Sequence, residues 1–148
     1  MSVEDLELAW AAGFFDGEGS VMYAERRTAR GTLYRQLQTS ISQSSSPELL
    51  LRFRDAVQAG AVTGPYHANR PSKPIWRWAA SCTDTLAIAK KLHLLLGSEK
   101  KARFDEAIKR WEGFEPSHVR CAHGGSYATC SDCHRISALK AWETRRAA

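Results

Sequence analysis

Two carboxylates stand among glycines near the start of the chain. Residues 9–21 read Ala-Trp-Ala-Ala-Gly-Phe-Phe-Asp-Gly-Glu-Gly-Ser-Val, so an apolar run ends at Asp16 and Glu18. Glycine costs roughly 1 kcal/mol at a helical position, which predicts that a helix ends here with both carboxylates at its tip. There they face the negative end of the helix dipole, and a bound metal ion would supply positive charge. An ordinary helix ending in two solvated acids is the alternative interpretation.

A second group of candidate ligands lies near the C-terminus. Three of the four cysteines gather there, and a chain without a secretory signal favours metal over disulfide chemistry. The expected zinc ligands are three cysteines and one histidine: Cys121, Cys130 and Cys133, with His123, its alternative His118 or, as a weaker choice, His134. A zinc ion would help about 30 residues with few large apolar side chains to fold. A basic tail with incidental cysteines is the alternative.

The segments between these two groups follow strand and helix patterns in turn. After the first helix, alternation predicts strands over residues 20–28, 32–42, 61–68 and 73–82. Helical spacing predicts a helix that starts at Pro47 and stops before Gly60, another capped by Thr83 or Asp84, and a last one after Gly97. We predict a domain over residues 1–113 and a basic helical extension over 114–148.

Charge and hydropathy narrow the class of partner and compartment. The chain of 148 residues carries 21 Lys and Arg against 16 Asp and Glu, a net charge of +5. Such a surplus favours a polyanion, although many basic proteins bind none. No segment has the about 20 apolar residues that span a bilayer, and no signal peptide is visible. We therefore expect a cytoplasmic protein that does not bind membranes.

The residues from Ala11 to Gly19, with the following Ser-Val, resemble the motif of LAGLIDADG homing endonucleases. The departures are mild: Phe14 and Phe15 replace aliphatic residues, and glycine and glutamate stand at positions 17 and 18 for alanine and aspartate. Together with the order of elements, the resemblance covers residues 5 to about 112. It implies an α+β fold, the αββαββα half-domain with a curved antiparallel four-stranded sheet. The tail resembles zinc modules attached to some phage and bacterial nucleases, which suggests such an origin.

The resemblance assigns candidate roles at the cleavage site. It implies that Glu18, with the Gly17 carbonyl, binds Mg²⁺ or Mn²⁺, while Asp16 is mainly structural. Glutamate keeps a hard oxygen ligand suited to magnesium. A polar side chain that positions water falls on Gln43, just past the second strand, where a polar loop residue is an equal alternative. A supporting lysine falls on Lys100 or Lys101, and the sequence does not decide which one points inward.

A chain with one motif implies a homodimer, because each half supplies one acid and two strands must be cut. Ala9, Ala12 and Gly13 are small and lie on one side of the first helix, which would let a second copy approach closely. An isologous dimer presents identical surfaces to both half-sites, so the DNA target should be roughly palindromic.

The resemblance also implies that the sheet reads DNA in the major groove, where Arg suits guanine and Gln suits adenine. The expected DNA-facing residues lie on alternate strand positions and in the second hairpin: Met22, Ala24, Arg26, Thr28, Tyr34, Gln36, Gln38, Ser40, Arg70 and Arg77. Loop residues that only keep the protein soluble are an equal alternative for Arg26, Arg30 and Arg70. The opposite side, with Trp76 and Trp78, is expected in the core.

The resemblance implies a site-specific double-strand DNA endonuclease that acts as a homodimer by metal-dependent phosphodiester hydrolysis. One alternative is a cleavage-inactive DNA-binding regulator, or an intron RNA maturase, on the same fold. Another is a zinc-dependent transcription regulator in which the front domain only dimerises.

Overall fold

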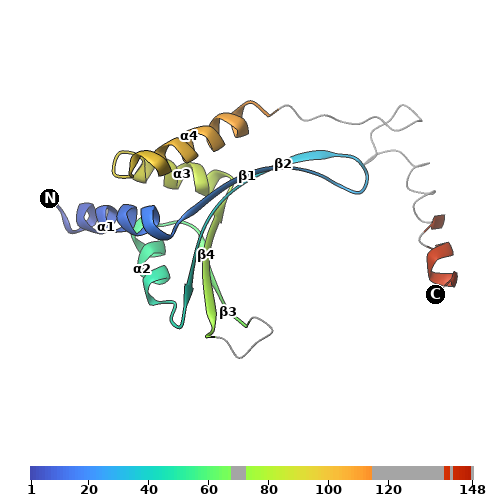
Figure 1. Cartoon of the computed structure of the whole chain (residues 1–148), viewed down its shortest axis with the longest axis horizontal. Helices are drawn as coiled ribbons and strands as arrows, with labels where there is room; N and C mark the ends of the chain where they lie inside the picture. Colours follow the sequence, from blue (N-terminus) through green and yellow to red (C-terminus); the bar gives the residue numbers. More distant parts are fainter. Residues whose placement is uncertain (68–72, 115–138, 141, 148) are drawn as a thin grey trace. The chain divides into compact units, whose positions relative to one another are not determined.

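The computed structural model describes residues 1–67, 73–114, 139–140 and 142–147. The elements follow the predicted order (Figure 1): α1 (Val3–Glu18), β1 (Ser20–Arg27), β2 (Leu33–Ser44), α2 (Glu48–Val57), β3 (Ala61–Tyr66), β4 (Ile75–Ser81), α3 (Thr83–Leu92) and α4 (Ser98–Glu112). Residues 139–140 and 142–147 are helical as well. None of the described helices is long and apolar enough to cross a membrane.

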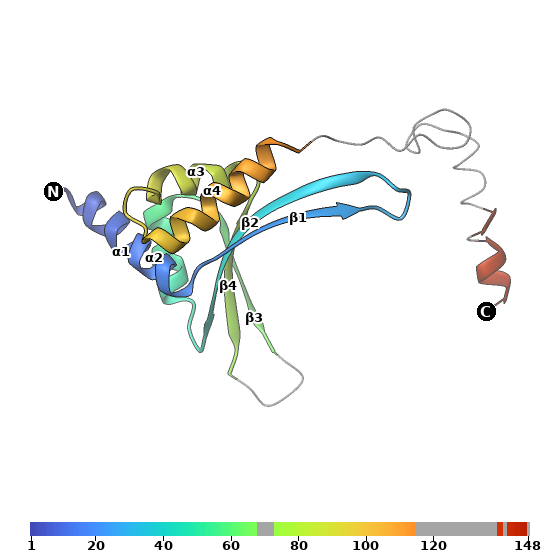
Figure 2. The same cartoon turned by 45° about the horizontal axis from the view of Figure 1, so that its top comes forward.

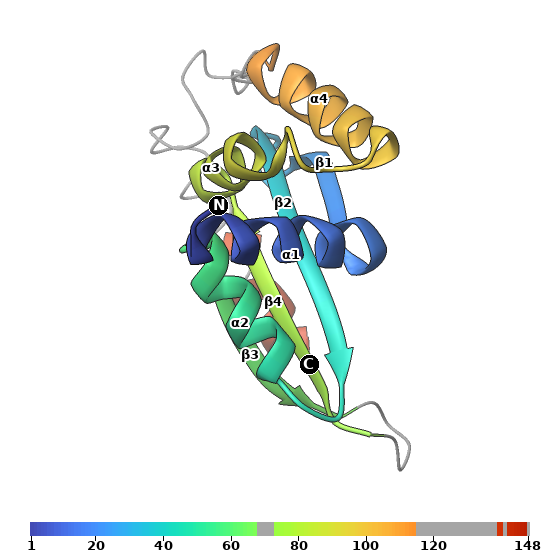
Figure 3. The ribbon, with the colours of Figure 1, turned by 90° about the vertical axis from the view of Figure 1, so that its left-hand side faces the viewer.

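The four strands form one sheet in the order β1-β2-β4-β3. β4 pairs antiparallel with both β2 and β3, and α1 to α4 lie on one face of the sheet (Figure 1, Figure 3). The register places Ile41 opposite Trp78 on this helix-covered face. The other face carries the alternate residues, as the two-residue period of a strand requires. The predicted α+β architecture is therefore confirmed.

Aromatic side chains join the helices to the sheet. Phe15 of α1 stacks on Phe53 of α2 and on Phe104 of α4, with ring centroids 6.0 and 5.5 Å apart. Trp78 of β4 meets Phe53 edge-on at 4.7 Å, and its indole N–H donates to the Ala59 carbonyl at 3.0 Å. All four rings are completely buried. The C-terminal half of α1 is thus held in the core.

The chain divides into two compact units, one of residues Met1–Ala24 and Gln36–Gly113, the other of Glu25–Arg35 and Phe114–Ala148. The first unit contains the four helices, β3, β4 and the parts of β1 and β2 next to them. In the second unit, Arg35 lies 5.5 Å from the centre of the Phe114 ring. A functional division between residues 1–113 and 114–148 stays a prediction.

Two local predictions are wrong. The N-cap of α3 is Cys82, with φ 51° and ψ −118°, rather than Thr83 or Asp84, and no side chain caps this helix. Thr85 instead donates its hydroxyl to the Ala80 carbonyl, which ties the first turn to β4. Thr28 lies beyond the end of β1, where its hydroxyl accepts from the Thr32 N–H and closes the turn.

Candidate active site

Glu18 is the last residue of α1, and its side chain is exposed. Gly19 follows as the C-cap, and its N–H donates to the Phe15 carbonyl at 2.8 Å. A Cβ on Gly19 would lie 2.5 Å from the Phe15 ring, a contact that no side chain tolerates. Gly19 is therefore required by close packing, and it turns the chain from α1 into β1 directly after the carboxylate.

Lys100 of α4 reaches this end of α1. Its ammonium donates a hydrogen bond to the Gly19 carbonyl and lies 5.8 Å from the centre of the Phe15 ring. Lys101 turns elsewhere, to the Leu94 carbonyl at 3.4 Å. The contacts therefore distinguish the two lysines that the sequence left equal. A cation from another helix stands at the negative end of α1, where the sequence suggested that metal charge was needed.

Asp16 of α1 makes a contact in the opposite direction, to the start of α4. Its Oδ2 accepts from the Gly97 N–H at 2.8 Å, and Gly97 is the N-cap of α4. Gly97 has no side chain to cap its own helix, so a carboxylate of α1 takes that place at the positive end of the α4 dipole. The end of α1 and the start of α4 lie side by side (Figure 2, Figure 3). The two helices thus exchange charged groups at their facing ends.

Gln43 lies inside β2 rather than past its end. It pairs with Trp76 of β4 and is half-buried on the face that also holds Ile41. The prediction of a loop position is wrong because β2 extends to Ser44. A role for Gln43 in positioning water stays a prediction.

One face of α1 is covered by none of the residues that the structure describes. Ala9 and Gly13 are exposed, and a Cβ on Gly13 or Gly17 would meet no atom within 4 Å. Leu6, one turn before, is 50% exposed. Ala12 is different: it is 1% exposed and belongs to the core of its own chain, so its predicted place in a dimer interface is wrong. The available surface runs along Leu6, Ala9, Gly13 and Gly17.

The face of the sheet away from the helices is mostly polar near the centre. The register places Gln38 opposite Ser81, Ser40 opposite Ala79 and Ser42 opposite Arg77. Strand alternation adds Gln36 to this face, and Met22 and Ala24 from β1, because Val21 packs on the core and Tyr23 lies against Arg110 of α4. The Nε of Arg77 is buried and has no hydrogen-bond partner among the described residues.

Several predicted site residues belong to other parts of the chain. Arg26, Thr28 and Tyr34 are exposed residues of the second unit. The remaining candidates lie outside the described residues: Arg70, His118, Cys121, His123, Cys130, Cys133 and His134. Among the residues that are described, no three histidine, cysteine, aspartate or glutamate side chains come together as a metal site. The zinc site stays a prediction.

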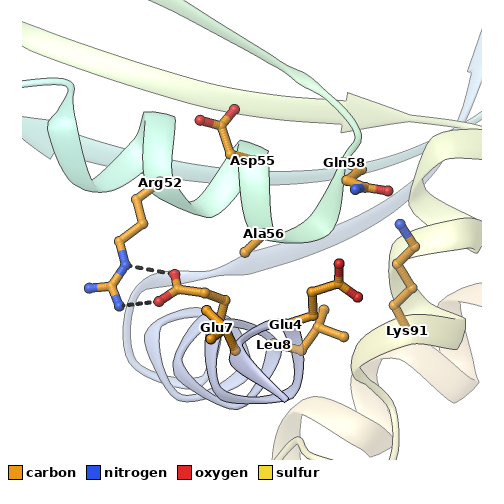
Figure 4. A pocket seen from close by; sticks show the side chains of 9 residues that line it. Glu4, Glu7, Leu8, Arg52, Asp55, Ala56, Gln58 and Lys91 are labelled. Carbon is orange, nitrogen blue, oxygen red and sulfur yellow. Dashed lines mark hydrogen bonds and ion pairs between the residues drawn. The ribbon is translucent and has the colours of Figure 1, made fainter.

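A hollow of about 650 Å³ lies at the opposite end of α1 (Figure 4). Glu7 forms an ion pair there with Arg52 at 2.8 Å, and Arg52 lies 3.9 Å from the centre of the Trp10 ring. The hydrogen bond from Arg52 lowers the pKa of Glu7 from its ordinary value. At about 1.5 Å per residue, this pair lies three helical turns from Glu18 and is separate from the candidate active site.

No family model and no curated protein matches the sequence, but solved structures share its arrangement. The homing endonuclease I-CvuI, in complex with its target, superposes with a TM-score of 0.61 and 18% identity over 74% of this chain and 68% of its own. The chain has the LAGLIDADG homing-endonuclease fold. The archaeal intron-encoded homing endonuclease I-Vdi141I shares this fold. It matches with a TM-score of 0.57 and 18% identity, over 74% of this chain and 72% of its own. The group I intron-encoded I-CeuI, in complex with DNA, matches with a TM-score of 0.57 and 15% identity, over 76% of this chain and 56% of its own.

The chemistry of the donors at the α1 end suits a hard divalent cation. Glu18 offers an exposed carboxylate, and the empty space around Gly17 leaves the adjoining backbone accessible. Carboxylate and carbonyl oxygens are ligands that Mg²⁺ accepts, usually with several waters. One chain offers few such oxygens at this end, so a second carboxylate from another copy would make a stronger site.

Proposed function

We propose that this protein is a site-specific DNA endonuclease that hydrolyses phosphodiester bonds as a homodimer, with a divalent metal ion at Glu18. The observation that carries this proposal is the exposed Glu18 carboxylate at the tip of α1, next to the carbonyl that binds the Lys100 ammonium. An acid for a metal and a cation for a phosphate thus stand at one helix end. The fold, shared with endonucleases solved in complex with DNA, supports the same conclusion.

In this proposal, each residue at the α1 end has a separate task. Glu18, with the Gly17 carbonyl, would hold Mg²⁺ or Mn²⁺. The bound ion would supply Lewis acidity and activate a water molecule. Lys100 would place its positive charge beside the scissile phosphate, where charge develops during hydrolysis. Gln43 is kept as a candidate for positioning water.

Double-stranded DNA would lie on the open face of the sheet. Gln36, Gln38, Ser40 and Arg77 of this face offer the amide, hydroxyl and guanidinium groups that pair with base edges in the major groove. The basic tail, with a zinc ion, would add contacts to the DNA backbone.

The homodimer would form along the face of α1 that no described residue covers. Gly13 and Gly17 let two helix backbones approach closely, and Leu6 and Ala9 extend the apolar contact. Two copies that meet here would bring both Glu18 side chains to one region, and the two half-sites would be related by the same two-fold axis.

The decisive experiment measures cleavage and binding on a target selected from a randomised DNA pool in Mg²⁺. Replacing Glu18 by glutamine removes the charge and keeps the size, so we expect at least about a 100-fold lower cleavage rate with unchanged DNA affinity. Glu112→Gln is the matched control, since Glu112 also ends a helix before a glycine and is exposed. Wild-type cleavage by Glu18→Gln would refute the proposal.

Other outcomes would favour the alternatives. A parent protein that binds the selected duplex and never cuts it would be a DNA-binding regulator. Preference for a structured intron RNA over duplex DNA would indicate a maturase.

The dimer has its own test. Gly13→Leu adds a side chain where a single chain has open space, so the monomer should fold normally. If two α1 helices meet at Gly13, the variant should sediment as a monomer at concentrations where the parent protein is a dimer. Ala102→Leu, on the exposed side of α4, is the control and should leave the dimer unchanged. A dimeric Gly13→Leu would place the interface elsewhere.

A further inference from the structure

Asp16 stands at a place where its charge acts on a different helix. Its carboxylate accepts from the N–H of Gly97, at the start of α4, and the two residues are separated by 81 positions. Ser98, Glu99 and Lys100 form the first turn of α4, so the position of this turn decides where the Lys100 ammonium lies. We propose that Asp16 is a positioning residue that anchors the start of α4 and thereby holds Lys100 beside Glu18. This inference rests on the proposed function.

The two hydrogen bonds described between the ends of α1 and α4 complement each other electrostatically. Asp16, negative, lies at the positive end of α4, and Lys100, positive, lies at the negative end of α1. Each contact favours the same approach of the two helix ends. Glu18 lies between Asp16 and Gly19 in the sequence, so the helix end that carries the metal-binding acid is fixed from both sides.

The start of α4 has no equivalent anchor of its own. Gly97 lacks a side chain, and no side-chain hydrogen bond from α4 caps the helix. Glu99, the acid of the first turn, pairs with Arg103 further along α4 at 3.0 Å. A Cβ on Gly97 would lie 3.3 Å from Asp16 Oδ2, so the fit between the two residues is close. Removing the Asp16 carboxylate would leave the Gly97 N–H without its acceptor.

The first test measures the accessibility of each lysine and needs no DNA. Limited acetylation, read by mass spectrometry, should label Lys100 more slowly than Lys109, because Lys100 is half-buried and hydrogen-bonded whereas Lys109 is exposed. In Asp16→Ala the labelling rate of Lys100 should rise toward that of Lys109. Lys91 of α3, whose ammonium donates to the Val57 carbonyl at 2.7 Å, is the internal control and should keep its rate. Asp16→Asn retains an oxygen acceptor for Gly97 and should give a smaller rise.

The second test measures single-turnover cleavage with protein and Mg²⁺ in excess. We expect Asp16→Ala to lower the rate about 10- to 100-fold, because small displacements of a reacting group have such effects, and to leave the affinity for DNA unchanged. Asp84→Ala is the matched control: Asp84 is an exposed acid in the first turn of α3. The Asp84→Ala variant should have a slightly lower thermal stability, because it loses a negative charge at the positive end of the α3 dipole, and should keep the parental cleavage rate.

The outcomes separate the two proposals. An unchanged Lys100 labelling rate in folded Asp16→Ala, or an equal rise at Lys91, would overturn the positioning role. Parental cleavage by Asp16→Ala with a labelled Lys100 would overturn it as well. A parent protein that never cleaves, in which Asp16→Ala still exposes Lys100, would overturn the proposed function alone. If Asp16→Ala does not fold, Asp16→Asn and Gly97→Ala carry the same comparison, each with a partial rise in Lys100 labelling and a partial loss of rate.

Discussion

The two ends of α1 are stabilised in different ways. At the N-terminal end, the Ser2 hydroxyl accepts from the Asp5 N–H at 3.1 Å and the Asp5 carboxylate accepts from the Ser2 N–H at 2.8 Å, both within three positions. At the C-terminal end, both stabilising side-chain contacts come from or reach residues 81 positions away. The first end would keep its cap in an isolated helix, whereas the second exists only in the folded chain. The end proposed to perform the chemistry is therefore the one whose stabilising hydrogen bonds at the helix terminus depend on tertiary structure.

This difference has a physical reason. A local capping box satisfies the free N–H groups of the first turn and makes no demand on the rest of the molecule. A functional carboxylate must be exposed and must be fixed relative to groups from other elements, which a local cap does not achieve. At the C-terminal end, the packing of Phe15 on Phe53 and Phe104 supplies that fixation.

The largest effect on the C-terminal end of α1 is expected from enlarging Gly19. In Gly19→Ala, the Cβ would lie 2.5 Å from the Phe15 ring and from the Phe15 carbonyl oxygen, so α1 or Phe15 must move. We expect a loss of roughly 1–3 kcal/mol in the free energy of unfolding, typical of overpacked sites. Since Gly19 also binds Lys100, cleavage should fall more than stability alone explains. Urea unfolding and single-turnover cleavage measure the two effects.

Gly113→Ala is the matched control for this variant. Gly19 and Gly113 are both helix C-caps with ordinary negative φ angles, −77° and −80°, so backbone freedom does not distinguish them. Among the described residues, a Cβ on Gly113 would meet the Lys109 carbonyl alone, at 3.3 Å. Its stability should change by less than about 1 kcal/mol. Equal effects of the two substitutions would show that Phe15 packing does not define the α1 end.

The same division between local and distant contacts explains what the sequence could predict. The alternation in residues 32–42 correctly separated a buried face with Leu37 and Ile41 from a polar face with Gln36 and Gln38. Gly17 and Gly19, on either side of Glu18, correctly predicted the end of α1. Both are short-range patterns, in which each residue type acts through its own backbone or its near neighbours.

The sequence did not predict contacts that depend on how α4 docks. Lys100 and Lys101 are adjacent, and about 100° of helix rotation separates their directions, so composition alone could not choose between them. The contact of Asp16 with Gly97 has only a weak signal in the sequence: α4 starts after Gly97, a residue without a side chain that could cap it. Ala12 was misplaced for a similar reason: small residues at helical spacing suit a dimer interface and a tight core equally, and only the packing of α1 decides.

The smallest expected effect concerns acid at the N-terminal end of α1. The backbone N–H and the hydroxyl of Ser2 lower the pKa of Asp5 from its ordinary value of 3.8. A carboxyl whose pKa is lower in the folded state adds stability above its unfolded pKa and loses that stability as pH falls through the folded value. Asp5→Asn should therefore lower the melting temperature slightly at pH 7, and the difference from the parent should shrink below pH 3.8. Because Asp5 is fully exposed, the change in melting temperature should be far smaller than that of Gly19→Ala.

Melting curves between pH 7 and 3 measure the effect of Asp5→Asn, with Glu112→Gln as a control acid at the end of a helix. Cleavage by Asp5→Asn at pH 7 should stay parental. A loss of cleavage in Asp5→Asn would mean that the local end of α1 also controls the active site, and the contrast between the two ends would no longer hold.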